Sequence, residues 1–110
     1  MIKLTSATRI YCAIQPADFR KGIDGLNHYC QTLTAETANT KSGALIVFIN
    51  RARTMIRVLS YDGPGFWLAT KRLSQGRFTA WPTSASAVSS CPAEQLMKIL
   101  QQMPKGEIAN

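Results

Sequence analysis

The chain of 110 residues carries 13 lysines and arginines against 6 acidic residues, a formal net charge of +7. This length suits one domain that buries roughly two-thirds of the surface its unfolded chain exposes, so neither a metal nor a disulfide is required for folding. There is no run of about 18 apolar residues and no charged-then-apolar N-terminus, which argues against a membrane helix and a secretion signal and predicts a cytoplasmic protein. The positive charge favours an anionic partner.

The first half of the chain predicts a strand, a helix and a second strand. Residues 9–14 alternate as in a half-buried strand, which Gln15 and Pro16 end. Asp18 is placed to be the N-cap of a helix. Four apolar residues follow with helical spacing: Ile23, Leu26, Cys30 and Leu33. Residues 34–42 are polar and predict a loop, whereas residues 44–49 are apolar without alternation, typical of a strand near the centre of a sheet.

The second half predicts three more strands and a helix. Strands are expected at residues 55–61, 66–71 and 77–81, because short turn sequences separate these apolar runs. Residues 83–90 are small and polar and predict a flexible connection. A last helix is expected to begin at Pro92. Its buried stripe is formed by Leu96, Ile99, Leu100 and Met103.

These elements define the expected architecture. Their order is strand, helix, four strands, helix, which predicts an α+β fold with a mainly antiparallel sheet of about five strands and two helices. We expect a single domain over residues 1–104 and a flexible tail at residues 105–110.

Positive charge is concentrated in the strand-rich region. Between residues 51 and 77, six cations face the single acid Asp62: Arg51, Arg53, Arg57, Lys71, Arg72 and Arg77. Alternate turns of an antiparallel meander lie at the same end of the sheet, so the basic turns near residues 50–53 and 74–76 should lie together, opposite the turn at 62–65. The six cations are therefore candidate nucleic-acid-binding residues, and the pattern fits DNA and RNA alike.

Two residues of this region have alternative interpretations. Trp67 shares its face of the predicted strand with Lys71, which makes it the best candidate for an exposed side chain that stacks on a base. The other aromatic residues are expected mainly in the core. Arg57 shares its face with apolar residues and is alternatively expected to lie flat on the sheet.

The start of the first predicted helix supplies a second candidate surface. Arg20 and Lys21 would oppose the helix dipole there, which favours a role in binding a partner or nucleic acid. Gly22 and Gly25 would each cost about 1 kcal/mol in a helix relative to alanine. They therefore suggest close approach of a partner or phosphate, although packing against the sheet is the simpler explanation.

Catalysis is the weakest of the alternatives. Asp18, Asp24 and Asp62 suggest a metal-dependent nuclease, but a helix cap, a helix surface and a turn explain them more simply. The three cysteines include no Cys-x-x-Cys pair, so we expect reduced apolar side chains and neither a zinc site nor a cofactor. Cys91, before the last predicted helix, is the one reactive side chain left open, since a helix N-terminus favours a thiolate, although a buried or unreactive thiol is the simpler explanation.

Several ordered motifs carry a family resemblance. They are DFRKGIDGL at residues 18–26, YDGPGF at 61–66, KRL at 71–73, GRF at 76–78 with Trp81 and Pro82, and PAEQL at 92–96. Together they resemble the TnpB-type accessory protein, the second reading frame, of the bacterial insertion-sequence family numbered sixty-six, which is unrelated to the RNA-guided nuclease of the same name. The chain departs from the family pattern at Cys91, where Thr or Ser usually precedes the proline.

The resemblance implies a non-catalytic helper in DNA transposition, acting beside a DDE-type transposase and a small co-encoded protein. The expected partners are accordingly DNA, either the element ends or DNA in general, and these two proteins. Assembly into a homo-oligomer is a further possibility that the resemblance leaves open. The alternative is a protein-interaction adaptor for the transposase or the small co-protein that makes no direct DNA contact.

Overall fold

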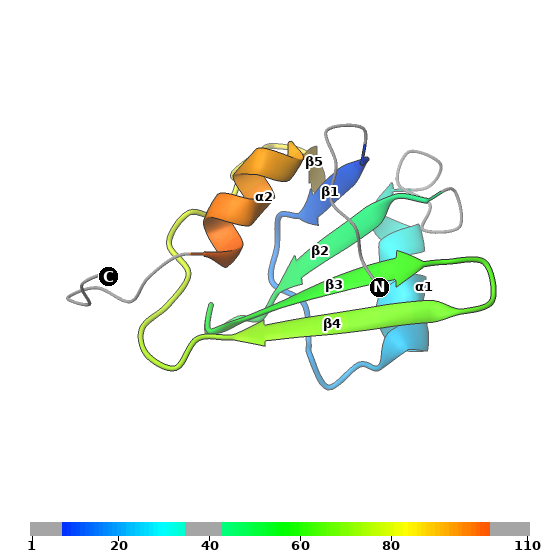
Figure 1. Ribbon diagram of the computed structural model, residues 1–110, viewed down its shortest axis with the longest axis horizontal. Helices are drawn as coiled ribbons and strands as arrows, with labels where there is room; N and C mark the ends of the chain where they lie inside the picture. The colour runs from blue at the N-terminus through cyan, green and yellow to red at the C-terminus, as the bar shows by residue number, and fades with distance from the viewer. Residues whose placement is uncertain (1–7, 35–42, 102–110) are drawn as a thin grey trace.

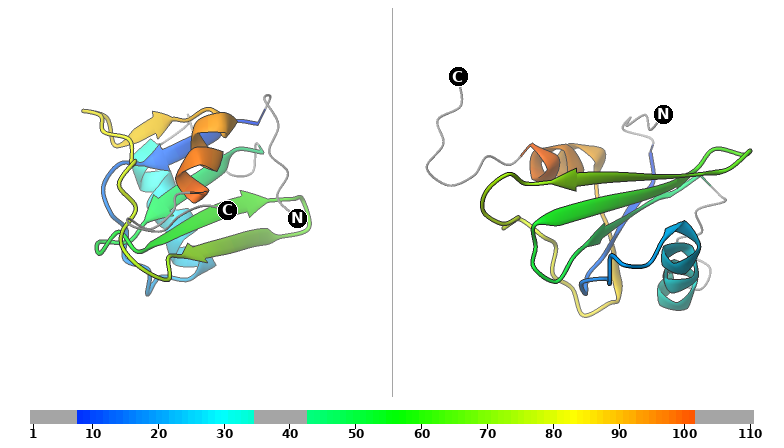
Figure 2. Two further views of the ribbon diagram at one scale, coloured as in Figure 1. Left: turned by 60° about the vertical axis from the view of Figure 1, so that its left-hand side comes forward. Right: turned by 90° about the horizontal axis from the view of Figure 1, so that it is seen from below.

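The computed structural model describes residues 8–34 and 43–101 as an α+β fold (Figure 1). Five strands form one sheet, and a helix covers part of each of its faces, as the view from below makes clear (Figure 2). In chain order the elements are β1 (Ile10–Ala13), α1 (Ile23–Thr34), β2 (Leu45–Ile49), β3 (Met55–Tyr61), β4 (Phe66–Arg72), β5 (Val88–Ser90) and α2 (Ala93–Leu100).

The sheet has the strand order β4-β3-β2-β1-β5. Only β1 and β2 are parallel, since α1 connects them as a crossover; the other three pairs are antiparallel. The predicted class, an α+β fold with a mainly antiparallel sheet, is therefore confirmed. β2 lies at the centre with all five residues buried, as its unbroken apolar sequence predicts.

Each face of the sheet has its own core. Leu96 and Ile99 of α2 pack with Ile10, Val47 and Ile56 on one face. On the other face, Leu26 and Cys30 of α1 pack with Ile46, Phe48 and Leu59. Alternate residues of the same strands thus serve two layers, which leaves the charged side chains to the turns and to the outer strand β4.

The strand predicted at residues 77–81 is wrong. Phe78 and Trp81 are both buried, with exposed fractions of 1% and 7%, but they lie three residues apart, a spacing that a strand does not place on one face. The Phe78 N–H donates to the Arg53 carbonyl at 2.7 Å, and the Trp81 indole donates to the Ala13 carbonyl at 3.1 Å. These residues therefore cross the end of the sheet as an irregular segment.

The fifth strand lies instead in the segment predicted as a flexible connection. β5 pairs with β1 through Tyr11 opposite Ser90 and Ala13 opposite Val88. Its serines have little strand propensity, so only backbone hydrogen bonding to the open edge of β1 makes it a strand.

The first helix begins later than predicted. The Ala17 N–H donates to the Ile49 carbonyl at 2.9 Å, which holds the chain extended beside β2. Helical hydrogen bonding then starts with the Leu26 N–H and the Gly22 carbonyl, so Asp18 is not the N-cap. Arg20 and Lys21 consequently precede the helix and do not oppose its dipole.

The second helix begins at Ala93, one residue after the prediction, with Pro92 as N-cap and no side-chain capping bond. Several predictions fall outside the described residues: the loop at residues 35–42, Met103 and the tail at residues 105–110. The domain boundary at residue 104 stays a prediction.

Candidate nucleic-acid interface

Both basic turns lie at one end of the sheet, which we call the basic end. The Leu73 N–H donates to the Thr54 carbonyl at 2.9 Å, and the Phe78 N–H donates to the Arg53 carbonyl at 2.7 Å. These bonds fasten residues 73–78 to the β2–β3 turn. The turn at residues 62–65 lies at the far ends of β3 and β4, because Tyr61 pairs with Phe66 there. The predicted placement of the three turns is confirmed.

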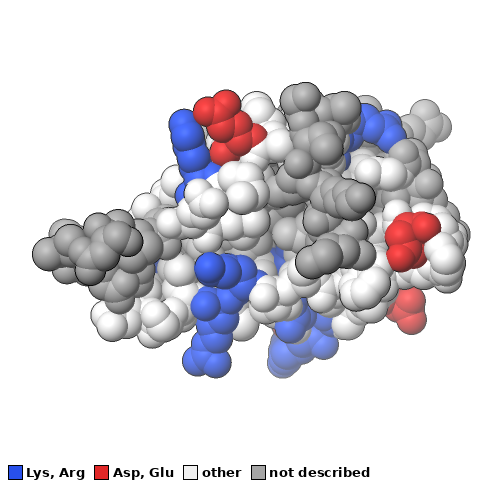
Figure 3. All heavy atoms as spheres, in the orientation of Figure 1, with Lys and Arg blue, Asp and Glu red and all other residues white. Residues whose placement is uncertain are grey.

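One face of the charge distribution is seen in Figure 3. Lys and Arg side chains gather along the lower edge of this face, below α2 (Figure 3). Acidic side chains lie at the right-hand end and at the upper left, where one adjoins a basic side chain, and further basic side chains lie at the upper right (Figure 3). The lower edge is therefore a part of this face where positive charge has no acidic neighbour in view.

The β2–β3 turn is held in one conformation by Asn50. Its side-chain oxygen accepts the N–H groups of Thr54 and Met55 at 2.9 and 3.0 Å, and its side-chain nitrogen donates to the Thr54 hydroxyl at 3.0 Å. Within this turn Arg53 has a φ of 63°, in the left-handed region that few residues other than glycine adopt. Asn50 belongs to the predicted turn, but its role in fixing the turn was not predictable, because its partners are mostly backbone groups.

A groove opens beside this turn, between the end of β1 and residues 77–84. Its volume is about 610 Å³. The lining residues are Ile14, Gln15, Pro16, Arg53, Arg77, Phe78, Thr79, Trp81, Pro82, Thr83 and Ser84. We call it the end groove. It brings together two of the predicted site residues, Arg53 and Arg77, that are 24 positions apart in the sequence.

Arg51 lies on the other side of the turn, in a hollow that it shares with Asp18 and Arg20. The Arg20 guanidinium bonds the Asp18 carboxylate, with Nη2 and Oδ2 2.7 Å apart. These side-chain bonds lower the pKa of Asp18 to about 2 and raise the pKa of Arg20. Asp18 thus offsets the charge of Arg20 at neutral pH, whereas no acid is paired with Arg51 in the described ion pairs.

Arg57 has a structural role that its position in the sequence does not reveal. Its guanidinium donates to the Phe19 carbonyl at 2.7 Å and to the Thr70 hydroxyl at 3.1 Å. The guanidinium carbon also lies 4.7 Å from the centre of the Phe19 ring. Arg57 therefore lies flat on the sheet and fastens the loop before α1, which agrees with the alternative interpretation of this residue.

Lys21 and the two glycines form a local packing arrangement. The Lys21 ammonium lies 5.0 Å from the centre of the Tyr29 ring. A Cβ at Gly25 would lie 3.0 Å from the Lys21 Cβ, so the glycine makes room for the lysine side chain. A Cβ at Gly22 would meet nothing within 4 Å. Packing against Lys21, not against the sheet, accounts for Gly25.

Trp67 is exposed, as predicted, with 49% of its surface accessible. It lies near the far end of β4, however, and its indole donates to the Asp62 carboxylate at 2.7 Å. This bond and the Gly65 N–H lower the pKa of Asp62. Lys71 lies four residues further along the strand, roughly 13 Å away. The structure therefore does not bring Trp67 to the basic end.

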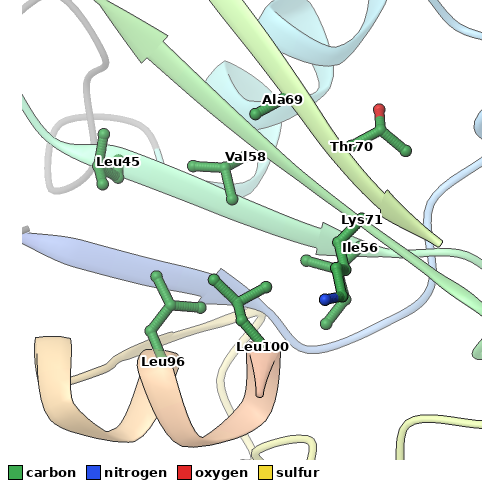
Figure 4. A pocket seen from close by; sticks show the side chains of 8 residues that line it. All are labelled: Leu45, Ile56, Val58, Ala69, Thr70, Lys71, Leu96 and Leu100. Atoms are coloured by element: carbon green, nitrogen blue, oxygen red, sulfur yellow. The ribbon is translucent and has the colours of Figure 1, made fainter. Parts of the chain in front are cut away.

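Lys71 and Arg72 end β4 on opposite faces, because Lys71 pairs with Ile56 and Arg72 with Met55. Arg72 adjoins the basic turns. Lys71 instead contributes to an apolar groove between β4 and α2, where Leu96 and Leu100 point toward the sheet (Figure 4).

We call this second opening the side groove. Its volume is about 260 Å³, and it is lined by Leu45, Ile56, Val58, Ala69, Thr70, Lys71, Leu96 and Leu100. Trp67 shares a strand face with Ala69, and Met97 of α2 is also exposed. The large exposed apolar side chains among the described residues thus belong to the elements that flank the side groove.

Cys91 is a buried thiol, as its simpler explanation predicted, and the reactive alternative is not supported. Burial raises the pKa of Cys91 and, more strongly, that of Cys12, so both thiols are protonated at neutral pH. All three cysteines are free and buried. Among residues 8–34 and 43–101, no three metal-binding side chains are grouped together. In the same parts of the chain, no helix is long and apolar enough to cross a membrane.

These features define a class of small α+β protein that presents a basic end and an apolar side. The family model described as IS66 Orf2 like protein matches residues 8–107. The chain therefore belongs to the IS66 Orf2-like family, a family of accessory proteins associated with insertion sequences and transposition and not of known enzymes.

Two relatives come from Sinorhizobium fredii (strain NBRC 101917 / NGR234). The uncharacterized protein y4jC is 34% identical over 94 residues, covering 86% of this chain and 79% of the relative. The uncharacterized protein y4hO is 34% identical over 87 residues, covering 78% and 73%. No solved structure matches the chain.

Proposed function

We propose that this protein is a non-catalytic accessory factor of transposition that binds DNA, alone or in a nucleoprotein complex, through its basic end. The observation that carries this proposal is the joining of two turns by backbone hydrogen bonds. These bonds gather the exposed arginines Arg51, Arg53, Arg72 and Arg77 on one end of the sheet. In this proposal the protein needs no cofactor and acts in the cytoplasm.

The chemistry of the four arginines supports a phosphate ligand. Guanidinium groups donate paired hydrogen bonds to phosphate oxygens, which suits a DNA backbone. The four arginines are exposed and lie at one end of the sheet, so we assign the DNA contact mainly to the turns. Contact with the DNA backbone in place of base edges gives little sequence preference.

A salt titration tests this proposal. The purified protein is mixed with labelled duplex from the element ends and with unrelated duplex, and affinity is measured by fluorescence anisotropy. If about four phosphates are neutralised, affinity for both duplexes falls on the order of a hundredfold between roughly 50 and 200 mM salt. Affinity that does not change with salt, or no binding at low salt, contradicts the proposal.

The side groove favours a second candidate, an adaptor that binds a protein of the same element, the transposase or the small co-protein. An apolar groove flanked by the exposed Trp67 and Met97 suits a protein segment better than a polyanion. Lys71 at the groove would then meet an acidic residue of that partner. Co-elution of the purified proteins in size-exclusion chromatography tests this candidate, and separate elution of every pair contradicts it.

A further inference from the structure

The end groove combines positive charge with an apolar wall. Of the described residues that line it, Arg53 and Arg77 are charged and none is acidic. Hydroxyl and amide groups accompany them at Gln15, Thr79, Thr83 and Ser84. Ile14, Pro16, Trp81 and Pro82 supply the apolar part of the lining. A ligand that fills the groove must therefore carry negative charge on one side and a flat or apolar group on the other.

Arg53 has a backbone conformation that glycine adopts more readily, with a φ of 63°. Such strain is retained where the surrounding structure holds it. Here Asn50 fixes the turn, and the Arg53 carbonyl accepts the Phe78 N–H. Glycine would adopt this conformation without strain but would leave the groove with one arginine fewer.

The size of the groove distinguishes between forms of DNA. Its volume of about 610 Å³ lies within the usual range of small-ligand pockets, roughly 300 to 1,000 Å³. A base-paired duplex presents its phosphates on the outside and keeps its bases stacked, so it would contact the arginines and leave the apolar wall unfilled. An unpaired nucleotide has both the phosphate and an exposed flat base.

We propose that the end groove binds one unpaired nucleotide of DNA, with its phosphate between Arg53 and Arg77 and its base against the wall formed by Ile14, Pro16 and Pro82. This inference rests on the proposed function and specifies the form of DNA that the basic end prefers. The remaining arginines, Arg51 and Arg72, bind the adjoining duplex backbone without regard to pairing.

A matched set of DNA molecules tests the inference. One duplex carries a four-nucleotide single-stranded overhang, and a blunt duplex that is two base pairs longer carries the same number of phosphates. The protein should bind the overhang duplex about tenfold more tightly, because only an unpaired base can fill the apolar part of the groove. Equal affinity for the two duplexes overturns the inference and leaves salt-dependent DNA binding standing.

Variants then assign the preference to the groove. The double variant Arg53→Ala, Arg77→Ala should remove the tenfold preference for the overhang duplex. The double variant Arg51→Ala, Arg72→Ala loses the same charge at the same end. It should lower the affinity for both duplexes equally and retain the tenfold preference. A preference that survives in the first variant, or is lost in the second, overturns the inference. So does the absence of all DNA binding at low salt, which would also end the proposed function.

The variant Arg53→Gly distinguishes loss of the Arg53 side chain from loss of the fold. Glycine fits the backbone at φ 63° without strain, so this variant should have a melting temperature at or above that of the unaltered protein. Its preference for the overhang should nevertheless fall several-fold. An unchanged preference in this stable variant contradicts a role for the Arg53 side chain in the groove.

Discussion

The basic end and the side groove are built from the same strands but offer different chemistry. At the basic end, cations extend from turns that backbone hydrogen bonds hold together. Beside α2, the same sheet presents Leu45, Val58 and Ala69 to a groove of about 260 Å³. Leu96 and Leu100 of α2 line the groove from the other side. The difference follows from which parts of the sheet other elements cover. Because α2 leaves β4 uncovered, an apolar groove remains between them, and because no described strand covers the turns, their side chains stay exposed. If the proposed function and its second candidate both hold, one small domain would bind a nucleic acid and a protein through separate regions.

Removing charge from the basic end should have the largest effect. The variant Arg51→Ala, Arg53→Ala, Arg72→Ala and Arg77→Ala should reduce DNA affinity on the order of a hundredfold at low salt and lower the salt slope by about four. Fluorescence anisotropy across a salt series measures both. Lys98→Gln, which removes a charge on α2, serves as the control and should change affinity little. A similar loss in both variants would show a response to net charge alone.

The next prediction concerns Arg57, which belongs to neither region. Arg57→Met should lower the free energy of unfolding by about 2 kcal/mol, because charged hydrogen bonds to Phe19 and Thr70 are lost. Urea denaturation measures this change. DNA affinity per folded molecule should stay within about twofold. A large loss of affinity with normal stability would place Arg57 in the binding surface after all.

Changes beside the side groove should affect protein binding alone. Trp67→Ala with Met97→Ala should weaken binding to a protein partner of the element by about tenfold, since exposed aromatic side chains often dominate such interfaces. Isothermal titration calorimetry measures this, and anisotropy on the same variant should give unchanged DNA affinity. Loss of DNA binding instead would mean that the two regions form one surface.

The smallest effect is expected from acid titration of the far turn. The pKa of Asp62 is lowered below its ordinary value of 3.8, mainly by the hydrogen bond from Trp67. The carboxylate therefore stabilises the turn above pH about 4, and this contribution is lost as the pH falls through the lowered pKa. Trp67 fluorescence should change with a midpoint below pH 3.8.

Two variants test whether the fluorescence change at Trp67 is caused by the titration of Asp62. Asp62→Asn should abolish the fluorescence transition, because the acceptor no longer titrates. Trp67→Phe should remove the signal and leave only Trp81, which is buried beside Ala13. A transition that persists in Asp62→Asn would assign it to another acid.

Much of the fold was predictable because it depends on local periodicity. The apolar run at residues 44–49 predicted the central strand, and the turns between apolar runs predicted a meander with both basic turns at one end. The helical spacing of Leu26 and Cys30 placed α1, whose start was misjudged because a distant bond from Ala17 to Ile49 keeps the preceding chain extended.

Composition and local pattern alone determined the α+β class, the central strand and the concentration of arginine near the turns. Tertiary contacts decided which arginines remain at the surface: Arg57 is bonded to residues up to 38 positions away, whereas Arg53 and Arg77 meet in one groove. Contacts between residues so far apart in the chain have no periodic pattern in the sequence, because they form only when the sheet and the segment after β4 pack together. For the same reason β5, a strand without apolar alternation, and the buried pair Phe78 and Trp81 were decided by packing.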